Sequence, residues 1–205
     1  MTDAAGSPVA EPAAPAQESV RDRILKTARD LFYRDGARAV GVDTVVARSG
    51  VAKTSLYRWF PSKDALIAAV VEAEARDRWA GWDRNGANAP AEPREQLRAQ
   101  LAGIARFVSS PKYRGCPFMN VTVEFPDTEH PARKVACEVM HELRRRVRAL
   151  VEPLGVRDPA GLTEQIVMLI DGAFSSAQTF GANGPQQHLV AAVDALVDAQ
   201  LPGRS

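Results

Sequence analysis

The chain contains little cysteine and no long apolar run, and both absences limit what it can be. Cys116 and Cys137 are the only cysteines in 205 residues, which is too few for a disulfide framework, and they lack the CxxC spacing of a zinc site. No stretch approaches the roughly 20 apolar residues that a membrane helix needs. The N-terminus has neither the basic start nor the apolar core of a signal peptide. We therefore expect no membrane association, and a reducing cytoplasm as the compartment.

The sequence also lacks the short motifs of common enzyme classes. It has no glycine-rich phosphate loop, no H-E-x-x-H and no G-x-S-x-G. A nucleophile pair of Cys116 with His130 stays open, although no surrounding signature supports it. Cys137 and His141 have the spacing of two metal ligands on one helix turn, but both fall on its charged side and no third ligand follows. We expect no catalytic site, no metal and no cofactor.

Charge is distributed unevenly along the chain although the net charge is only +1. Residues 20–65 contain ten Lys/Arg and five Asp/Glu, so the rest of the chain is net acidic. A basic module beside a near-neutral body is typical of a DNA-binding protein, with a merely solvated basic face as the alternative. Residues 1–18 are rich in Ala, Pro, Glu and Gln, and we expect a disordered arm there.

Residues 42–63 (VDTVVARSGVAKTSLYRWFPSK) contain two short apolar runs on either side of a glycine turn. This spacing predicts two short helices that cross steeply, as in a helix-turn-helix. The residues available for the apolar contact between them are Val45, Val46, Val51, Leu56 and Phe60. A preceding helix is predicted from a Ser19 cap, an apolar stripe through Ile24, Ala28, Leu31 and Phe32, and an end at Gly36.

Residue identities within this stretch resemble the N-terminal domain of the TetR family of transcriptional regulators, continuously from about Ile24 to Leu66. The matching segments are Ser49-Gly50-Val51, Lys53-Thr54-Ser55, Leu56-Tyr57-Arg58-Trp59-Phe60 and Pro61-Ser62-Lys63-Asp64-Ala65-Leu66. Two positions depart from the family pattern: Ala52 replaces a usual capping serine, and Trp59 stands where His is common. The resemblance implies an all-α fold, with a three-helix helix-turn-helix domain over residues 19–64 and a larger helical ligand-binding and dimerisation domain over residues 65–205.

Contacts with double-stranded DNA are expected from the second short helix and its flanks. The start of that helix is expected to read base edges, whereas Tyr57 and Lys63 are expected to contact phosphates. Trp59 is expected either to contact a phosphate or to pack within the domain. Arg48 is expected either to contact a base edge or to be a solvated surface arginine. The candidate DNA-binding residues are Arg48, Lys53, Thr54, Ser55, Tyr57, Trp59 and Lys63.

The remaining two thirds of the chain read as helices: 62–82, 94–109, 131–154, 158 onward and 185–201, with a loop over 83–93. Residues 115–125 contain Gly-Cys-x-x-x-Asn-x-x-x-Glu, which recurs in one group of TetR-like C-terminal domains. An internal cavity for a small-molecule effector is expected beside this stretch, although core packing is the alternative for any single residue. The candidate ligand-binding residues are Phe107, Phe118, Met119, Val123 and Phe174.

Dimerisation is expected through the last two helices. The helix that begins near Asp158 is apolar on more than one side, and Gly172 and Ser175 are small enough to let another helix approach. Two such helices doubled by a two-fold axis would form a four-helix bundle, with leftover core helices of a monomer as the alternative. The chain is thus expected to be a ligand-responsive, homodimeric repressor on a pseudo-palindromic operator. A helical small-molecule or protein-binding module, or an enzyme using the Cys116 region, is the alternative.

Overall fold

The computed structural model describes residues 18–202, and within this range the chain consists of α-helices and short 3₁₀ turns without any strand. The all-α fold class is therefore confirmed. The predicted N-terminal arm falls on residues 1–17, outside the described residues, except for Glu18. The helices are α1 (Val20–Asp35), α2 (Val42–Ser49), α3 (Lys53–Trp59), α4 (Lys63–Ala87), α5 (Pro93–Val108), α6 (Pro117–Glu124), α7 (Pro131–Val151), α8 (Pro159–Phe180) and α9 (Leu189–Gln200).

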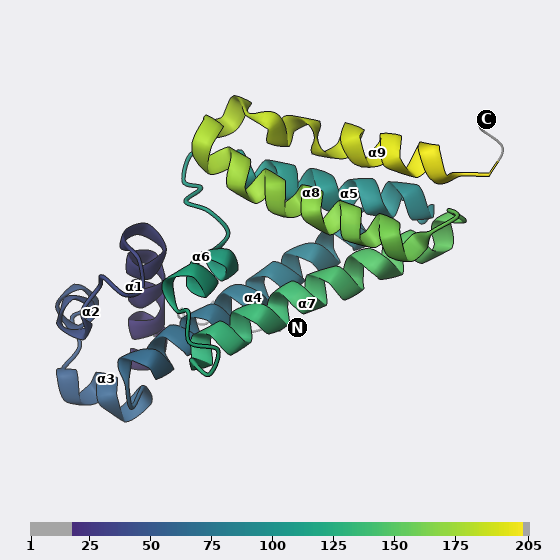
Figure 1. Cartoon of the computed structure of the whole chain (residues 1–205). Helices are drawn as coiled ribbons and strands as arrows, with labels where there is room; N and C mark the ends of the chain where they lie inside the picture. The colour runs from purple at the N-terminus through teal and green to yellow at the C-terminus, as the bar shows by residue number, and fades with distance from the viewer. Residues whose placement is uncertain (1–17, 203–205) are drawn as a thin grey trace, which may run out of the picture.

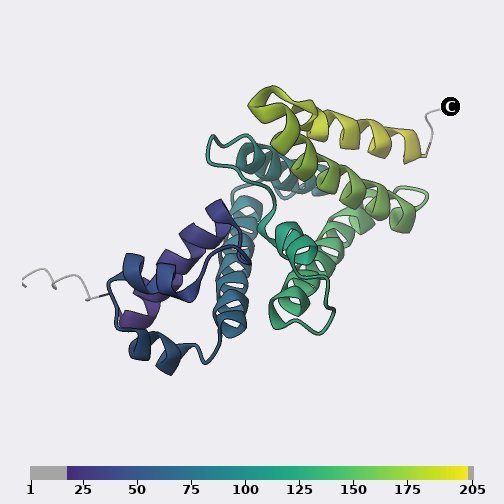
Figure 2. The ribbon, with the colours of Figure 1, turned by 60° about the vertical axis from the view of Figure 1, so that its left-hand side comes forward.

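The helices divide into an N-terminal unit, α1–α3, and a larger C-terminal unit, α4–α9 (Figure 1). The long helix α4 starts beside α3 and continues into the C-terminal unit, where α7 packs along it (Figures 1 and 2). Helices α5, α8 and α9 form a further layer, in which α5 packs on both α4 and α7 and α8 packs on α7. No helix between residues 18 and 202 combines the length and apolar character that crossing a lipid bilayer would take.

Helix α1 forms as its sequence pattern predicts. The Ser19 hydroxyl oxygen accepts a hydrogen bond from the Asp22 backbone N–H at 3.1 Å, which satisfies one of the free donors at the helix start. The predicted stripe of Ile24, Ala28, Leu31 and Phe32 is buried. It packs on α2, α3 and α4, and so holds together two helices that are too short to be stable alone.

Helix α4 extends to Ala87, beyond its predicted end near Trp82. The reason lies in α5, whose glutamines bond to carbonyls at the end of α4. Gln100 donates to the Trp82 carbonyl at 2.9 Å, and Gln96 donates to the Gly86 carbonyl at 3.1 Å. The Gly86 carbonyl is among the last carbonyls of the helix, which have no partner within an α-helix, so the bond from Gln96 favours helix through a segment with poor local propensity.

The buried side of α7 is rotated from the predicted stripe. Val135, Leu150 and Leu154 are only half-buried, whereas two alanines near the start of the helix are fully buried. Small side chains there allow α4 and α6 to approach α7 closely. The buried stripe consists of Ala132, Ala136, Val139, Leu143, Val147 and Val151.

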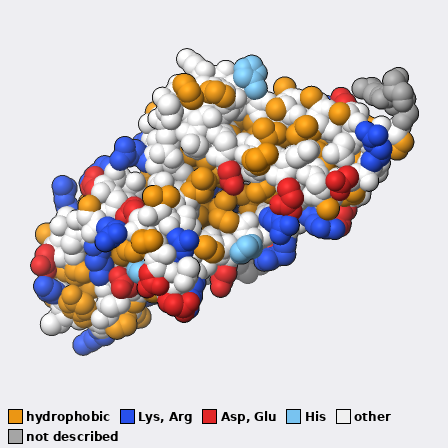
Figure 3. Space-filling view, viewed as in Figure 1, with side chains coloured by type: hydrophobic (Ala, Val, Ile, Leu, Met, Phe, Trp, Pro, Cys, Tyr) orange, Lys and Arg blue, Asp and Glu red, His pale blue; other side chains and the backbone are white. Residues whose placement is uncertain are grey.

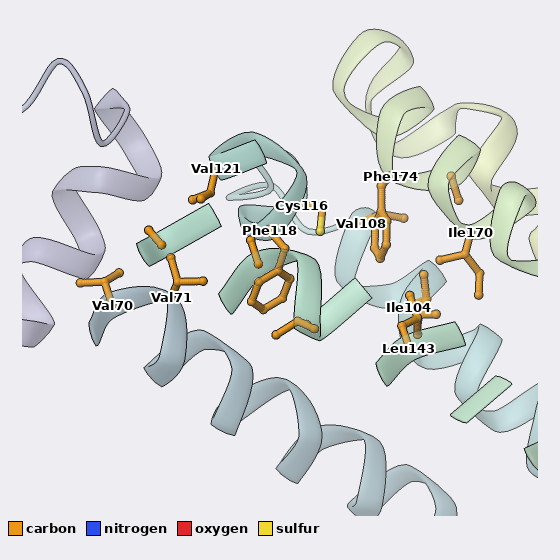
Figure 4. Packing of buried hydrophobic residues seen from close by; sticks show 14 of the residues in the cluster. Val70, Val71, Ile104, Val108, Cys116, Phe118, Val121, Leu143, Ile170 and Phe174 are labelled. Carbon is orange, nitrogen blue, oxygen red and sulfur yellow. The ribbon is translucent and has the colours of Figure 1, made fainter. Parts of the chain in front are cut away.

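The core of the C-terminal unit brings together side chains from all its layers (Figure 4). Phe118 of α6 and Phe174 of α8 are each 1% exposed, and they lie between α4, α5 and α7. Helix α6 thereby anchors its first turn in this core, while its other end reaches the N-terminal unit.

Candidate nucleic-acid interface and ligand cavity

The turn between α2 and α3 has the geometry of a helix-turn-helix. Gly50 adopts the left-handed conformation (φ 65°) that ends α2, as the glycine turn predicted. Arg23 of α1 donates to the Ser49 carbonyl at 2.7 Å and thereby holds the turn against α1. Val45 and Leu56 are fully buried, and Phe60 is 3% exposed, so the apolar contact between the two helices is largely as predicted.

Helix α3 presents most of the predicted DNA-binding residues to solvent. Lys53 and Thr54 are exposed and Ser55 is half-buried at its start. Tyr57 is 43% exposed and Trp59 is 49% exposed, which is far more than a packing role for Trp59 would give. Ala52 supplies no side-chain cap, in agreement with the sequence. The exposed face of α3 therefore offers hydroxyl, cationic and aromatic groups together.

Two of the candidate cations already have partners in this unit. The Lys53 ammonium lies 2.7 Å from the Asp43 carboxylate of α2, and this hydrogen bond raises the pKa of Lys53. The Lys63 ammonium donates to the Arg38 carbonyl at 2.8 Å. Arg48 is exposed near the end of α2. Both lysines are thus held at the α2–α3–α4 corner rather than extended freely.

A cavity of about 260 Å³ lies between α1, α4, α5 and α6. Its walls combine aromatic rings with charged and amide side chains, the mixture expected of a small-molecule site. It is lined by Arg29, Glu74, Asp77, Arg78, Gly81, Trp82, Asn85, Gln100, Gly103, Ile104, Phe107, Pro117 and Phe118.

The charges in this cavity are arranged in two groups. Arg29 of α1 binds Glu74, with one hydrogen bond of 2.9 Å, and also binds Asp77, so that one guanidinium serves both carboxylates. The Arg78 guanidinium instead lies over aromatic rings: 5.5 Å from the centre of Phe107 and 5.4 Å from the centres of Phe118 and Phe174.

The structure separates the five predicted ligand-binding residues. Phe107 and Phe118 line the cavity, and Phe174 lines a smaller space on the other side of Phe118. Met119 is half-buried and belongs to neither lining. Val123 lies outside both linings, and its side chain is 82% exposed. At 100° per residue, Val123 lies about 140° around α6 from Phe118 and so faces away from the core.

Arg78, Trp82 and Gln100 line the cavity but were not predicted from the sequence. A signal for the first two was present. The buried stripe of α4 passes through Ile67 and Val71, and its continuation at helical spacing falls on Glu74, Arg78 and Trp82. Charged residues on the buried side of a helix indicate a polar cavity or an ion-pair network.

The Gly-Cys-x-x-x-Asn-x-x-x-Glu segment lies at the junction of the two units. Tyr33 of α1 donates to the Gly115 carbonyl at 3.1 Å. Gly115 has φ 97°, and a Cβ there would lie 2.9 Å from the Asn120 amide oxygen. The Glu124 carboxylate accepts from the Arg38 backbone N–H at 2.9 Å. These residues therefore hold α6 against α1 and the α1–α2 connection. From this segment, only Pro117 and Phe118 line the cavity.

Cys116 is buried without an activating partner. Burial raises the pKa of its thiol, and the positive charge of Arg78 offsets this only in part. His130 stacks on Phe125 with the ring centres 4.1 Å apart, and its Nε2 lies 3.5 Å from an Asp64 carboxylate oxygen; neither contact involves Cys116. A reactive cysteine nucleophile needs a lowered pKa and access to solvent. Residues 18–202 contain no group of three or more His, Cys, Asp or Glu side chains that could hold a metal ion. Cys137 and His141 therefore belong to no such group.

Comparisons with known proteins agree along most of the chain. Residues 24–70 match the family model described as bacterial regulatory proteins, tetR family, and residues 93–193 match the tetracyclin repressor-like C-terminal domain. The crystal structure of SCO4454, a TetR-family transcriptional regulator from Streptomyces coelicolor, superposes with a TM-score of 0.84 at 30% identity, covering 88% of this chain and 95% of that chain.

Two curated relatives are also similar. The HTH-type transcriptional regulator YjdC of Escherichia coli is 24% identical over 157 residues, which is 76% of this chain and 81% of YjdC. The HTH-type transcriptional repressor KstR of Rhodococcus jostii is 38% identical over 92 residues, which is 44% of this chain and 42% of KstR. Helix-turn-helix geometry, family models and whole-chain superposition agree: the chain belongs to the TetR family of transcriptional regulators.

Proposed function

We propose that this regulator is a homodimeric repressor that binds a pseudo-palindromic operator and releases it when a small molecule occupies the cavity between α1, α4, α5 and α6. The observation that carries the proposal is the position of α6. Its first turn contributes Phe118 to the cavity, and its last residue, Glu124, bonds to Arg38 of the N-terminal unit. A ligand that displaces α6 would therefore act directly on the DNA-binding unit.

DNA contacts are assigned to the exposed face of α3. Its first turn, with Lys53, Thr54 and Ser55, is proposed to enter the major groove and read base edges. Tyr57, Trp59 and Lys63 are proposed to contact phosphates, and Arg48 of α2 to add a further contact. To act on bases, Lys53 must exchange its Asp43 partner for DNA.

The dimer is proposed to form through α8 and α9. Hydrophobic side chains gather around α8 on the face shown in Figure 3, and Met168 is 69% exposed and Phe180 63% exposed on that helix. A Cβ added at Gly172 would meet nothing within 4 Å, so a partner helix could approach there. Two recognition helices about 34–36 Å apart could then occupy successive major grooves.

Repression is proposed by analogy with the repressor KstR, which is 38% identical over 92 residues, although the activator FasR is 31% identical over 88 residues. We also propose that the protein acts in the cytoplasm, where the chromosome is accessible, and that it has no catalytic activity, since its relatives are transcriptional regulators.

The first test is selection of binding sites from a random DNA duplex library, with the bound fraction measured against salt concentration. We expect an enriched inverted repeat and a steep decrease of affinity with salt, because each phosphate contact releases counterions. A library without enrichment, bound weakly and independently of salt, would contradict the proposal. The selected operator then serves to measure release by candidate ligands.

A further inference from the structure

The Arg78 guanidinium has five N–H donors, and none of them is hydrogen-bonded to protein within residues 18–202. The same residues provide no carboxylate within ion-pair distance of it. Arg78 is half-buried between the rings of Phe107, Phe118 and Phe174. These rings attract the positive charge of Arg78 but offer no oxygen acceptor to its N–H donors. No Arg78 nitrogen is among the buried polar atoms that lack a partner, so these donors are accessible from the cavity and available to an anion.

A cationic ligand is disfavoured by the same contacts. Both carboxylates of the cavity, Glu74 and Asp77, are already bound by Arg29. Arg78 already lies over the rings of Phe107 and Phe118, which leaves Trp82 as the aromatic residue of the cavity lining that has no cation over it. A cation at the carboxylates or at the two phenylalanines would have to displace an arginine, whereas an anion would bind the open N–H donors of Arg78.

The rest of the cavity describes the remainder of the ligand. Trp82, Ile104 and Phe107 offer apolar surface. Gln100 is 3% exposed and donates to the Trp82 carbonyl, but its amide oxygen is buried without a partner. A volume of about 260 Å³ lies at the small end for ligand sites.

We propose that the effector is a small aromatic carboxylic acid whose carboxylate forms a bidentate pair with Arg78 while its ring packs against Trp82 and Phe107. A hydroxyl or amino substituent on the ligand would donate to the Gln100 amide oxygen. This inference rests on the proposed function, because it assigns a ligand class to the same cavity. The planar guanidinium matches a carboxylate with two parallel hydrogen bonds.

The test uses three acids of increasing size as probes: benzoate, phenylacetate and 2-naphthoate. Each is paired with its neutral primary amide and with the ammonium compound of the same ring, and binding to the full chain is measured by isothermal titration calorimetry. We expect at least one acid to bind at least about tenfold more tightly than its amide, because charged hydrogen bonds are lost in the amide. The ammonium compounds should bind most weakly.

Arg78→Gln and Arg76→Gln provide matched variants on the same helix. Both remove one positive charge, but Arg76 is exposed and lines an outer groove rather than the cavity. We expect Arg78→Gln to abolish the preference for acid over amide, and Arg76→Gln to retain it. Arg78→Lys, which keeps the charge without the planar fork, should retain only part of it.

Three outcomes would overturn the proposal: equal binding of acid and amide by the unaltered chain, tighter binding of an ammonium compound, or no binding of any acid. The comparison of acid and amide needs no variant, so a folding defect in Arg78→Gln cannot obscure it. Operator release is measured separately with the selected DNA. Release of the operator by a neutral or cationic probe alone would support the proposed function but exclude an anionic effector. Failure to select any operator would contradict the proposed function itself.

Discussion

Gly81 lies on the cavity wall, and a side chain added there would extend into the cavity. A Cβ at this position would approach only the end of Arg84, at 3.9 Å. We expect Gly81→Leu to fold and to lose ligand binding at least about tenfold. Gly81→Ala is the control: it should leave binding almost unchanged and stabilise α4 by up to about 1 kcal/mol, the difference in helix propensity. Calorimetry and urea denaturation of both variants measure this, and unaffected binding in Gly81→Leu would place the ligand elsewhere.

The two thiols should differ strongly in reactivity. Cys116 is 1% exposed and burial raises its pKa, whereas Cys137 is only half-buried. Because the thiolate is the reactive form, a raised pKa keeps Cys116 neutral at pH 7–8, and its reaction should accelerate only as the pH rises toward the raised value. Alkylation with iodoacetamide, followed by mass spectrometry, should label Cys137 first and Cys116 only on unfolding. Rapid labelling of Cys116 at neutral pH would reopen a chemical role for it.

Lys63 is proposed to bind phosphate from a fixed position, since its ammonium already donates to the Arg38 carbonyl. We expect Lys63→Ala to weaken binding to all DNA sequences similarly, and to lower the slope of log affinity against log salt by about one. Lys112→Ala removes the same charge from an exposed turn of the C-terminal unit and should leave the slope unchanged. Equal slopes for Lys63→Ala and the unaltered protein would remove Lys63 from the interface.

At the scale of elements, α6 connects the cavity with the N-terminal unit, and Glu124 is the contact that can be removed with least disturbance. The Glu124 carboxylate oxygen accepts from the Arg38 N–H, while Arg38 also donates to the Glu124 carbonyl at 3.1 Å. We expect Glu124→Ala to bind ligand normally but to need more ligand for operator release. Glu124→Gln keeps a hydrogen-bond acceptor and should respond almost as the unaltered protein does.

Ligand binding and operator release are measured on the same preparations of both Glu124 variants. Since ligand shifts the DNA-bound state only through its different affinity for two conformations, weakened coupling should reduce the effect of ligand on DNA affinity by several-fold. An unaltered ligand response in Glu124→Ala would show that the coupling passes through another contact, such as Tyr33 with Gly115.

The helix-turn-helix could be predicted from the sequence because its determinants are local. The Ser19 cap, the Gly50 turn and the stripe of α1 each depend on residues within a few positions of one another. The end of α4 could not be predicted from the sequence, because α4 accepts hydrogen bonds from Gln96 and Gln100 of α5 near that end. Long-range contacts of this kind leave no periodic pattern in the sequence.

The cavity was predicted only in part for the same reason. Phe107 and Phe118 were expected but Trp82 was not, and the charged wall joins Arg29 with Glu74, which are 45 residues apart. A side chain on a short helix is also hard to orient from sequence alone, as Val123 illustrates: α6 has only eight residues, and an apolar residue lies on its exposed side. The proposed DNA contacts remain predictions until the operator is known.

At the scale of the whole molecule, the proposed dimer depends on the exposed side of α8. We expect Met168→Glu to convert the dimer into a monomer, because a carboxylate would be buried without a partner at the two-fold interface. Operator affinity should fall by at least about 100-fold as the second recognition helix is lost. Size-exclusion chromatography with light scattering measures the mass. Ala149→Glu, on the exposed side of α7, should remain dimeric, and a dimeric Met168→Glu would place the interface elsewhere.

The three tryptophans give the protein its own fluorescent reporters at both ends of this pathway. Trp59 stands exposed on α3, whereas Trp79 and Trp82 of α4 lie edge to face with ring centres 6.3 Å apart, and Trp82 lines the cavity. In a Trp59→Phe protein the emission would report on α4 and its cavity, whereas the emission of the unaltered protein would also include the signal of Trp59 at the DNA. Stopped-flow emission from the two proteins could then time cavity occupation and operator release separately, without any attached dye.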